Sequence, residues 1–212
     1  TNALFSGLGA NTTYYARVLA LNHDETPTNF FIIGSTITRI IPPAVIAPTF
    51  PNVYISSLAI QWDSNSNAQG TFYVADLSSN SNFDAVLSSS ETLQTYATLS
   101  NLIGNTTYYA RVKARSSQGA ESQYLILGST LTNPAQLTAA SATFLQVTSQ
   151  TLSLAWDASG NAEGTIYVAE ISSQSDFSNK FSSTVFSWQA SYENLNLNTT
   201  YYARVKARSH AG

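Results

Sequence analysis

Hydrophobic and polar residues alternate along several stretches of the chain, and a two-residue period predicts β-strands with one buried face. In the clearest stretch, the face expected to be buried carries Tyr108, Ala110, Val112 and Ala114. The intervening positions of the same stretch carry Tyr109, Arg111, Lys113 and Arg115. The same alternation places Leu58, Ile60 and Trp62 on one expected strand and Tyr73, Ala75 and Leu77 on the next. We expect these apolar faces to form the hydrophobic core.

The expected strands recur at a fixed interval. The octapeptide NTTYYARV begins at residues 11, 105 and 198, so its copies lie 94 and then 93 residues apart. This interval is too long for a solenoid repeat and close to one immunoglobulin-like sandwich of roughly 100 residues. The segment Phe30–Thr38 also matches Tyr124–Thr132, and the strands of Trp62 and Tyr73 recur around Trp156 and Tyr167. The sequence therefore predicts an all-β chain of tandem sandwich domains.

Three domains follow from this interval. We predict the C-terminal part of a first repeat at 1–40, a complete repeat at 41–132 and a third repeat without its last strand at 133–212. The first part should contain three strands, Ala3–Ser6, Thr13–Ala20 and Phe30–Thr38. A sandwich that lacks strands exposes unpaired edges. We therefore expect either that more protein precedes and follows this segment or that another copy supplies the missing strands.

A leucine lies six residues before the first tyrosine of each copy, at Leu8, Leu102 and Leu195. Together with the buried tryptophan expected on the second strand, this pattern resembles fibronectin type III domains, in which a strand of the form L-x5-Y-x-V-x-V-x-A begins at a tyrosine corner. Ala110 and Ala203 stand where that family usually has valine. The turns DSNSNAQG and DASGNAEG, which follow the tryptophans, resemble those of repeats in large secreted bacterial surface proteins. The resemblance implies an extracellular or cell-surface location.

Composition narrows the classes of partner. Only 10% of the residues are charged, 43% are hydrophobic and the net charge is −3, which gives no general attraction to nucleic acid. The chain has no cysteine, so disulfides and thiolate metal sites are excluded. No apolar run approaches the ~20 residues of a membrane-spanning helix, so we expect no membrane insertion.

Aromatic, aliphatic and basic residues should share the outward face of the strands, which we call the contact face. In the second repeat its members are Phe72, Val74, Tyr109, Arg111 and Lys113. In the third repeat they are Ile166, Val168, Tyr202, Arg204 and Lys206. One interpretation is a solvated face with cross-strand charge pairs, and Asp76 and Glu170 are suitably placed for them. The other is a surface for assembly with other copies or neighbouring repeats, because aromatic residues and arginine are favoured at interfaces.

Other motifs allow further chemistry. Asn11, Asn105 and Asn198 satisfy the N-x-T rule for glycosylation, although asparagine and threonine also close tight turns. Asp63, Asn65 and Asn67 have the spacing of a calcium loop, but Ala68 replaces the glycine and a hydrogen-bonded turn explains them better. The two histidines, His23 and His210, lie at opposite ends of the chain, so we expect no catalytic residues, no metal site and no cofactor.

Two functions remain open. The first is a non-enzymatic structural module of an extracellular tandem-repeat protein that forms a surface filament, sheath or stalk. The second is an adhesion or carbohydrate-binding module, or a spacer, whose partners are glycans or cell-surface receptors. Trp188 is the one tryptophan outside the expected cores and would serve as a glycan platform or pack at a sheet edge.

Overall fold

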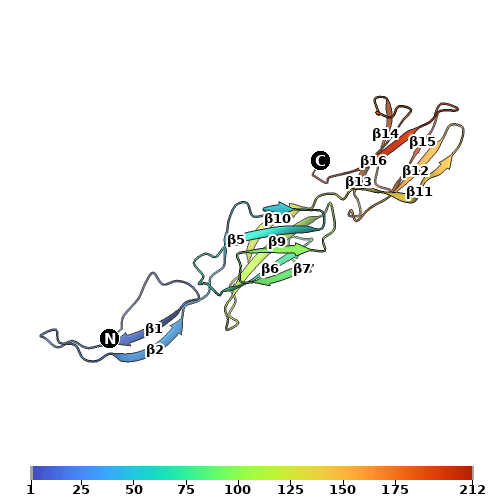
Figure 1. Ribbon diagram of the computed structural model, residues 1–212. Helices are drawn as coiled ribbons and strands as arrows, with labels where there is room; N and C mark the ends of the chain where they lie inside the picture. The colour runs from blue at the N-terminus through green and yellow to red at the C-terminus, as the bar shows by residue number, and fades with distance from the viewer. Residues whose placement is uncertain (1, 212) are drawn as a thin grey trace. The chain divides into compact units, whose positions relative to one another are not determined.

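The computed structural model describes residues 2–211, and every regular element in this range is a β-strand (Figure 1). In chain order the strands are β1 (Thr13–Val18), β2 (Phe31–Ile37), β3 (Ala44–Val45), β4 (Asn52–Val53), β5 (Ser57–Asp63), β6 (Phe72–Ser78), β7 (Ser88–Thr92), β8 (Tyr96–Ser100), β9 (Thr107–Arg115), β10 (Leu125–Leu131), β11 (Thr138–Val147), β12 (Leu152–Asp157), β13 (Ile166–Ser172), β14 (Lys180–Val185), β15 (Gln189–Tyr192) and β16 (Tyr202–Arg208). The all-β prediction is confirmed.

The chain divides into two compact units. The first consists of Thr1–Pro51, Ala59–Thr98 and Tyr109–Gly128, and the second of Asn52–Leu58, Leu99–Tyr108 and Ser129–Gly212. Both units take residues from the second repeat, so this division follows the packing of the chain and not the sequence interval. The repeat boundaries at residues 40 and 132 therefore remain a prediction.

The second repeat contains two sheets. One has the strand order β10-β9-β6-β7, and the other has the order β3-β5-β4 with β8 also paired to β5. The ring of Trp62, on β5, lies 5.6 Å from the ring of Tyr73, on β6, so side chains of the two sheets meet in the core. Leu58 and Ile60 are fully buried, which confirms the alternation read from the sequence.

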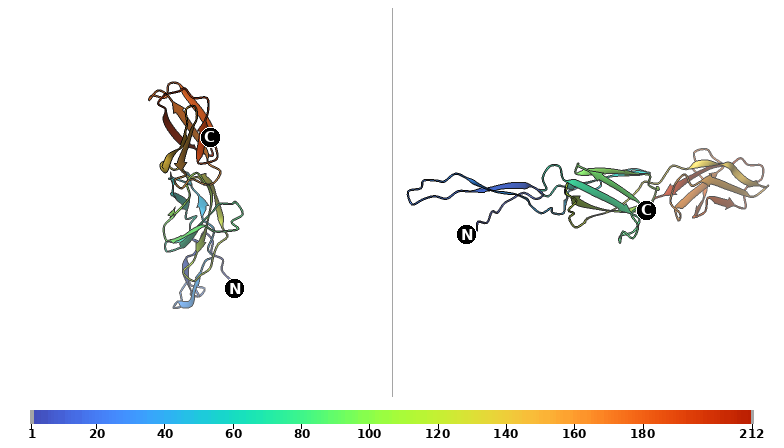
Figure 2. Two further views of the ribbon diagram at one scale, coloured as in Figure 1. Left: turned by 90° about the vertical axis from the view of Figure 1, so that its right-hand side faces the viewer. Right: turned by 90° about the horizontal axis from the view of Figure 1, so that it is seen from below.

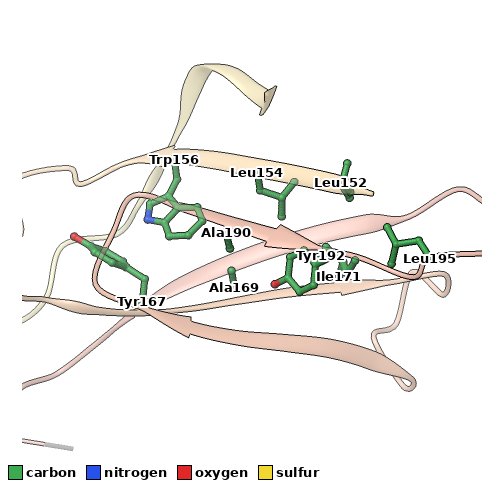
Figure 3. Close-up of a cluster of buried hydrophobic side chains, with 9 residues drawn as sticks. All are labelled: Leu152, Leu154, Trp156, Tyr167, Ala169, Ile171, Ala190, Tyr192 and Leu195. Carbon is green, nitrogen blue, oxygen red and sulfur yellow. The ribbon is translucent and has the colours of Figure 1, made fainter. Parts of the chain in front are cut away.

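The third repeat also contains two sheets, one of order β11-β12-β15 and another of order β14-β13-β16, and the described residues include no counterpart of β10. Its core consists of Leu152, Leu154, Trp156, Tyr167, Ala169, Ile171, Ala190, Tyr192 and Leu195. Figure 3 shows side chains of β12 and β15, from one sheet, facing side chains of β13, from the other sheet. The equivalent aromatic pair, Trp156 and Tyr167, is again in contact at 5.7 Å.

The first repeat is a ribbon of β1 and β2, an antiparallel pair with a register shift at Ala16/Arg17 (Figures 1 and 2). The strand predicted at Ala3–Ser6 was wrong, because this segment has no regular structure. In the second repeat the corresponding strand, β8, pairs with β5. The described part of the first repeat contains no counterpart of β5, and Phe5 is accordingly 70% exposed.

A tyrosine corner is formed in all three repeats. The backbone N–H groups of Gly9, Ile103 and Asn196 donate to the hydroxyl groups of Tyr14, Tyr108 and Tyr201, over 2.9, 2.9 and 3.1 Å. This bond ties each strand to the loop that precedes it. The expected feature is therefore confirmed, and it places the NTT tripeptide at the start of the tyrosine strand in each repeat.

Candidate repeat junctions and contact face

The strand register brings the residues of the contact face together as expected. In the second repeat Phe72 lies opposite Arg115, Val74 opposite Lys113 and Asp76 opposite Arg111. In the third repeat Ile166 lies opposite Arg208, Val168 opposite Lys206, Glu170 opposite Arg204 and Ser172 opposite Tyr202. Cross-strand neighbours on one face of an antiparallel pair are close enough for their side chains to interact.

Acidic side chains neutralise the basic residues of this face in the second repeat. Arg111 Nε donates to Asp76 Oδ2 at 3.1 Å, and Lys113 Nζ lies 2.5 Å from Glu121 Oε2. Arg115 forms an ion pair with Glu91. This arrangement matches the interpretation as a face with cross-strand charge pairs. The Arg111–Asp76 pair is largely buried, whereas the two pairs with exposed glutamates contribute about 1 kcal/mol or less each.

Arg111 also lies between two aromatic rings. Its Cζ atom is 3.9 Å from the ring centre of Tyr124 and 4.4 Å from that of Phe83. The hydroxyl of Tyr124 donates to Asp76 Oδ2 at 2.8 Å, so the same carboxylate holds both neighbours. Cation–π contact and hydrogen bonding together fix the guanidinium group in place. The sequence placed Arg111 correctly but gave no sign of Phe83 or Tyr124 as its partners.

The third repeat shows a related but more open cluster. Arg204 Cζ lies 4.2 Å from the ring centre of Phe177, the counterpart of Phe83. Glu170 accepts from Arg204 Nε at 2.7 Å and from Nη2 at 2.6 Å, and it also pairs with Lys180. Tyr202 is 46% exposed, whereas Tyr109 is less exposed than this. The face is therefore more accessible here than in the second repeat.

Hydrogen bonds from Lys180 and Arg204 hold the pKa of Glu170 below its usual value of 4.5. A lowered folded-state pKa stabilises the protein above the unfolded-state pKa, and this contribution is lost as pH falls through the folded value. We expect Glu170→Gln to lower the free energy of unfolding by about 1 kcal/mol at pH 7, since the two basic partners are about half exposed. Urea denaturation of both proteins between pH 7 and pH 3 measures this difference, which should shrink below about pH 4.5. Glu163→Gln, at an exposed glutamate, is the control, and a difference independent of pH would contradict the assignment.

The asparagine of each NTT tripeptide has a left-handed backbone, with φ values of 48°, 55° and 52° at Asn11, Asn105 and Asn198. Asparagine tolerates this conformation better than most residues. Their environments differ, because Asn105 is fully buried, Asn11 is half-buried and Asn198 is exposed. The contacts of this side chain are therefore most complete at the buried residue, Asn105.

Asn105 contacts residues that belong to the next repeat in the sequence. Its Nδ2 atom donates to Thr165 Oγ1 at 3.0 Å and to the carbonyl oxygen of Arg208 at 3.1 Å. Its Oδ1 atom accepts from the backbone N–H of His210 at 2.9 Å. All three polar functions of this amide are therefore satisfied within the protein.

We call the contact between neighbouring repeats at Asn105 the repeat junction. A second asparagine, Asn161, completes it. Asn161 donates to the carbonyl oxygen of Ala135 at 3.1 Å and accepts from the N–H of Ala135 at 2.7 Å, so it holds the linker between the repeats by both ends of its amide. The N–H of Ala162 donates to the carbonyl oxygen of Gly104 at 3.0 Å. Backbone and side chains thus join the corner loop, the linker and the turn Asp157–Gly164.

The same junction occurs earlier in the chain, between equivalent residues. Asn11 Nδ2 donates to Thr71 Oγ1 at 2.8 Å, and Asn67 exchanges two hydrogen bonds with the backbone of Ile41, at 2.8 and 3.2 Å. The N–H of Ala68 donates to the carbonyl oxygen of Ala10 at 3.1 Å. Two junctions made of the same residue types at the same positions indicate a built contact.

These contacts bear on the glycosylation motif. Attachment of a glycan requires an accessible Nδ2 atom, and in this structure Nδ2 of Asn105 is buried and donates two hydrogen bonds. Glycosylation of Asn105 is therefore incompatible with the junction. Modification of Asn11 and Asn198 remains a prediction.

The turn considered as a calcium loop uses its polar groups internally. Asp63 Oδ1 accepts from the N–H of Asn65 at 2.7 Å, and Asp157 Oδ1 accepts from that of Ser159 at 2.6 Å. These are the bonds of an Asx-type turn. Within residues 2–211 no cluster of three or more His, Asp or Glu residues could hold a metal ion.

Trp188 lies at the edge of the third repeat, and its side chain is 61% exposed. Its carbonyl oxygen accepts from the N–H of Trp156 at 3.1 Å. Together with Ala155, Ser187 and Gln189, the two tryptophans line a depression of about 450 Å³. More than half of the side chain is therefore exposed at this sheet edge.

No helix in the described part of the chain has the length and apolar character needed to cross a bilayer. No protein-family model matches the sequence, and no curated protein does. Among solved structures, the chain is similar to a two-domain fibronectin type III segment of chicken tenascin, with a TM-score of 0.52 and 12% identity over 78% of this chain and 90% of that chain. The FN1–FN3 domains of chicken CNTN1 align with a TM-score of 0.34 and 16% identity over 96% of this chain and 74% of that chain. At such identities the likeness to tenascin shows the fold alone, and the chain has the fold of tandem fibronectin type III sandwiches.

Proposed function

We propose that this chain is a segment of an extracellular tandem-repeat protein and acts as a non-enzymatic structural module of a surface filament, sheath or stalk. The observation that carries this proposal is the repeat junction, which occurs twice with an equivalent asparagine–threonine bond and an equivalent asparagine–linker bond. We expect modules joined by side chains as well as by a linker to resist bending at each joint, as a stiff spacer requires. The low charge of the chain, 10% of its residues, suits lateral packing.

The contact face is the surface we assign to that lateral packing. Tyr202 is 46% exposed, Tyr109 is half-buried, and both lie beside basic residues whose charges are already paired. Covering paired charges costs less than covering unpaired ones, and aromatic rings are favoured at interfaces. The partners would be other copies of the chain or neighbouring repeats.

The double variant Tyr109→Ser and Tyr202→Ser tests this assignment. We expect it to remove most of the self-association of the 212-residue chain, measured by analytical ultracentrifugation and electron microscopy, because the aromatic contact area is lost. Tyr96→Ser is the matched control, since Tyr96 is 58% exposed and lies on β8, in the other sheet. Circular dichroism should show that all variants stay folded. Unchanged association of the double variant would refute a role for the contact face.

The second candidate function is carbohydrate binding through Trp188. Its exposure and the depression beside Trp156 are the observations that favour it, since exposed aromatic rings pack against the apolar faces of sugars. A glycan array probed with the chain and with Trp188→Ala separates the two candidates. Signals that disappear in the variant would support binding, and an array without signals would remove this candidate.

A further inference from the structure

Strand β14 forms one border of its sheet. The strand order β14-β13-β16 places β13 between β14 and β16, so within residues 2–211 β14 has a partner strand on one side only. The equivalent strand of the second repeat, β7, also borders its sheet, and β10 closes the opposite side of that sheet. The free edge at β14 is therefore a feature that both repeats share, and it is independent of what lies beside β16.

The strand at this edge is regular along its whole length. It pairs with β13 in one continuous register, from Ser172 opposite Lys180 to Tyr167 opposite Val185. The segment Lys180–Val185 contains no proline, no glycine and no bulge. Natural edge strands are protected from further pairing by such interruptions or by charged side chains. The one charge on β14, at Lys180, is already paired with Glu170.

The equivalent edge of the second repeat carries an additional charge. On β7, Glu91 lies opposite Val74. On β14 the equivalent position, opposite Val168, is the neutral residue Thr184. The side chain of Glu91 is 43% exposed and forms an ion pair with Arg115. An exposed charge on an edge strand opposes pairing with another strand, so β7 is protected at a position where β14 is not.

The sequence of β14, KFSSTV, is self-complementary in an antiparallel pair. When Ser183 lies opposite Ser183 of a second copy, Phe181 lies opposite Val185, and Ser182 lies opposite Thr184. Each of these pairs occurs twice, once on each side of the axis, as a two-fold contact between identical chains requires. Aromatic side chains opposite β-branched ones and hydroxyl groups opposite each other are both favourable cross-strand pairs.

The same register brings exposed apolar surface together. Phe181 and Val185 lie on the core side of β14, because their partners on β13 are the buried residues Ile171 and Tyr167. Val185 packs against the core, whereas Phe181 is 52% exposed. In the paired strands the ring of each Phe181 would cover Val185 of the other copy. Pairing therefore removes apolar surface from water at both ends of the contact.

We propose that β14 pairs with β14 of a second copy of this chain, antiparallel and with Ser183 at the two-fold axis. The two sheets that contain β14 would then form one continuous sheet. This contact uses a sheet edge and not the contact face, and it does not depend on the proposed filament function. An edge of six residues is smaller than a standard interface of about 1,600 Å², so we expect a weak dimer with a dissociation constant on the order of 10–100 μM.

Cysteine cross-linking tests the register. The chain has no cysteine, so Ser183→Cys introduces a single thiol. Opposite residues of an antiparallel pair have Cβ atoms about 4.5–5.5 Å apart, which is close to their separation in a disulfide. With oxidised glutathione, we expect Ser183→Cys to form disulfide-linked dimers about tenfold faster than Ser90→Cys, because pairing raises the effective concentration of the thiols. Ser90 is the equivalent half-buried residue of β7, and non-reducing gels measure both rates.

The variant Thr184→Glu tests the edge itself. It gives β14 the charge that β7 carries at Glu91, so the fold of the third repeat should tolerate it. Sedimentation equilibrium of the 212-residue chain should show a dimer dissociation constant about tenfold higher than that of the unchanged chain. Gln189→Glu is the matched control, because it adds the same charge at an exposed residue of β15, in the other sheet, and should leave the dissociation constant unchanged.

A chain that stays monomeric at about 1 mM would overturn the proposal. Equal cross-linking of Ser183→Cys and Ser90→Cys would do the same, as would a dimer that Thr184→Glu leaves unchanged. If Thr184→Glu fails to fold, the cross-linking result decides alone.

The contact face is tested separately. We expect the double variant Tyr109→Ser and Tyr202→Ser to retain the cross-link of Ser183→Cys, since neither tyrosine lies on β14. Loss of the cross-link in that double variant would assign the dimer to the contact face and would count against pairing through β14.

Discussion

Replacing Asn105 by alanine is expected to lower the free energy of unfolding by about 3–4 kcal/mol. The side chain makes three hydrogen bonds in a fully buried position, and its removal leaves Thr165, Arg208 and His210 without their partner. Each lost bond contributes about 1 kcal/mol, and an alanine at a φ of 55° adds about 1 kcal/mol of backbone strain. Chemical denaturation at pH 7 measures the change.

The other two repeats supply matched controls for this variant. Asn11→Ala loses one bond, to Thr71, and we expect a change of about 2 kcal/mol, whereas Asn198→Ala, at an exposed residue, should show only the strain of about 1 kcal/mol. The three positions share nearly the same φ, so the backbone contribution cancels in the comparison. Equal effects at all three asparagines would show that the junction bonds contribute nothing to stability.

Replacing Leu154 by alanine should lower the free energy of unfolding by about 3–4 kcal/mol. Leu154 is only 3% exposed and packs in the centre of the third core, so its truncation removes buried apolar area and leaves a cavity (Figure 3). Thermal and urea denaturation both measure the loss.

Leu145→Ala is the control for this truncation, because Leu145 lies in the same repeat but is 51% exposed. Its effect should stay within about 0.5 kcal/mol. If both leucine variants lost the same stability, the core assigned to the third repeat would be incorrect.

The sequence predicted the cores because the two-residue period of a strand depends on local geometry alone. Each residue expected inside on the strands of Trp62, Tyr73, Trp156 and Tyr167 is buried. The prediction failed at Ala3–Ser6, which corresponds in the repeat to Ala97–Ser100 of β8. A strand needs a partner, and a partner is a property of the sheet that the pattern of one segment does not contain.

The role of the corner asparagines could not be read from the sequence, because their partners lie about 60 residues further along the chain. Two motifs recur at the same interval, NTT and the N-A-x-G-T turn, and this joint recurrence was the available signal. It indicates that the two motifs share one interval but does not indicate that their residues are in contact. The glycosylation rule applies to the same asparagine but contains no information on whether its side chain is buried.

On the contact face, the sequence placed the residues but not their interactions. The alternation put Arg111 and Asp76 near each other on neighbouring strands, and their ion pair follows from that register. Phe83 comes from a loop with a left-handed backbone at that residue, and loop geometry of this kind has no simple sequence period. The aromatic partners of Arg111 were therefore found only in the structure.

A single repeat carries one half of the junction at each of its two ends. The second repeat carries Asn67 and Thr71, which receive the preceding corner, and Asn105, which reaches the following turn. A tandem duplication of this unit would therefore create a new joint with all its hydrogen-bonding groups already in place. Loss of one unit would likewise rejoin matching surfaces, so the number of modules can change in a single recombination event without compensating substitutions.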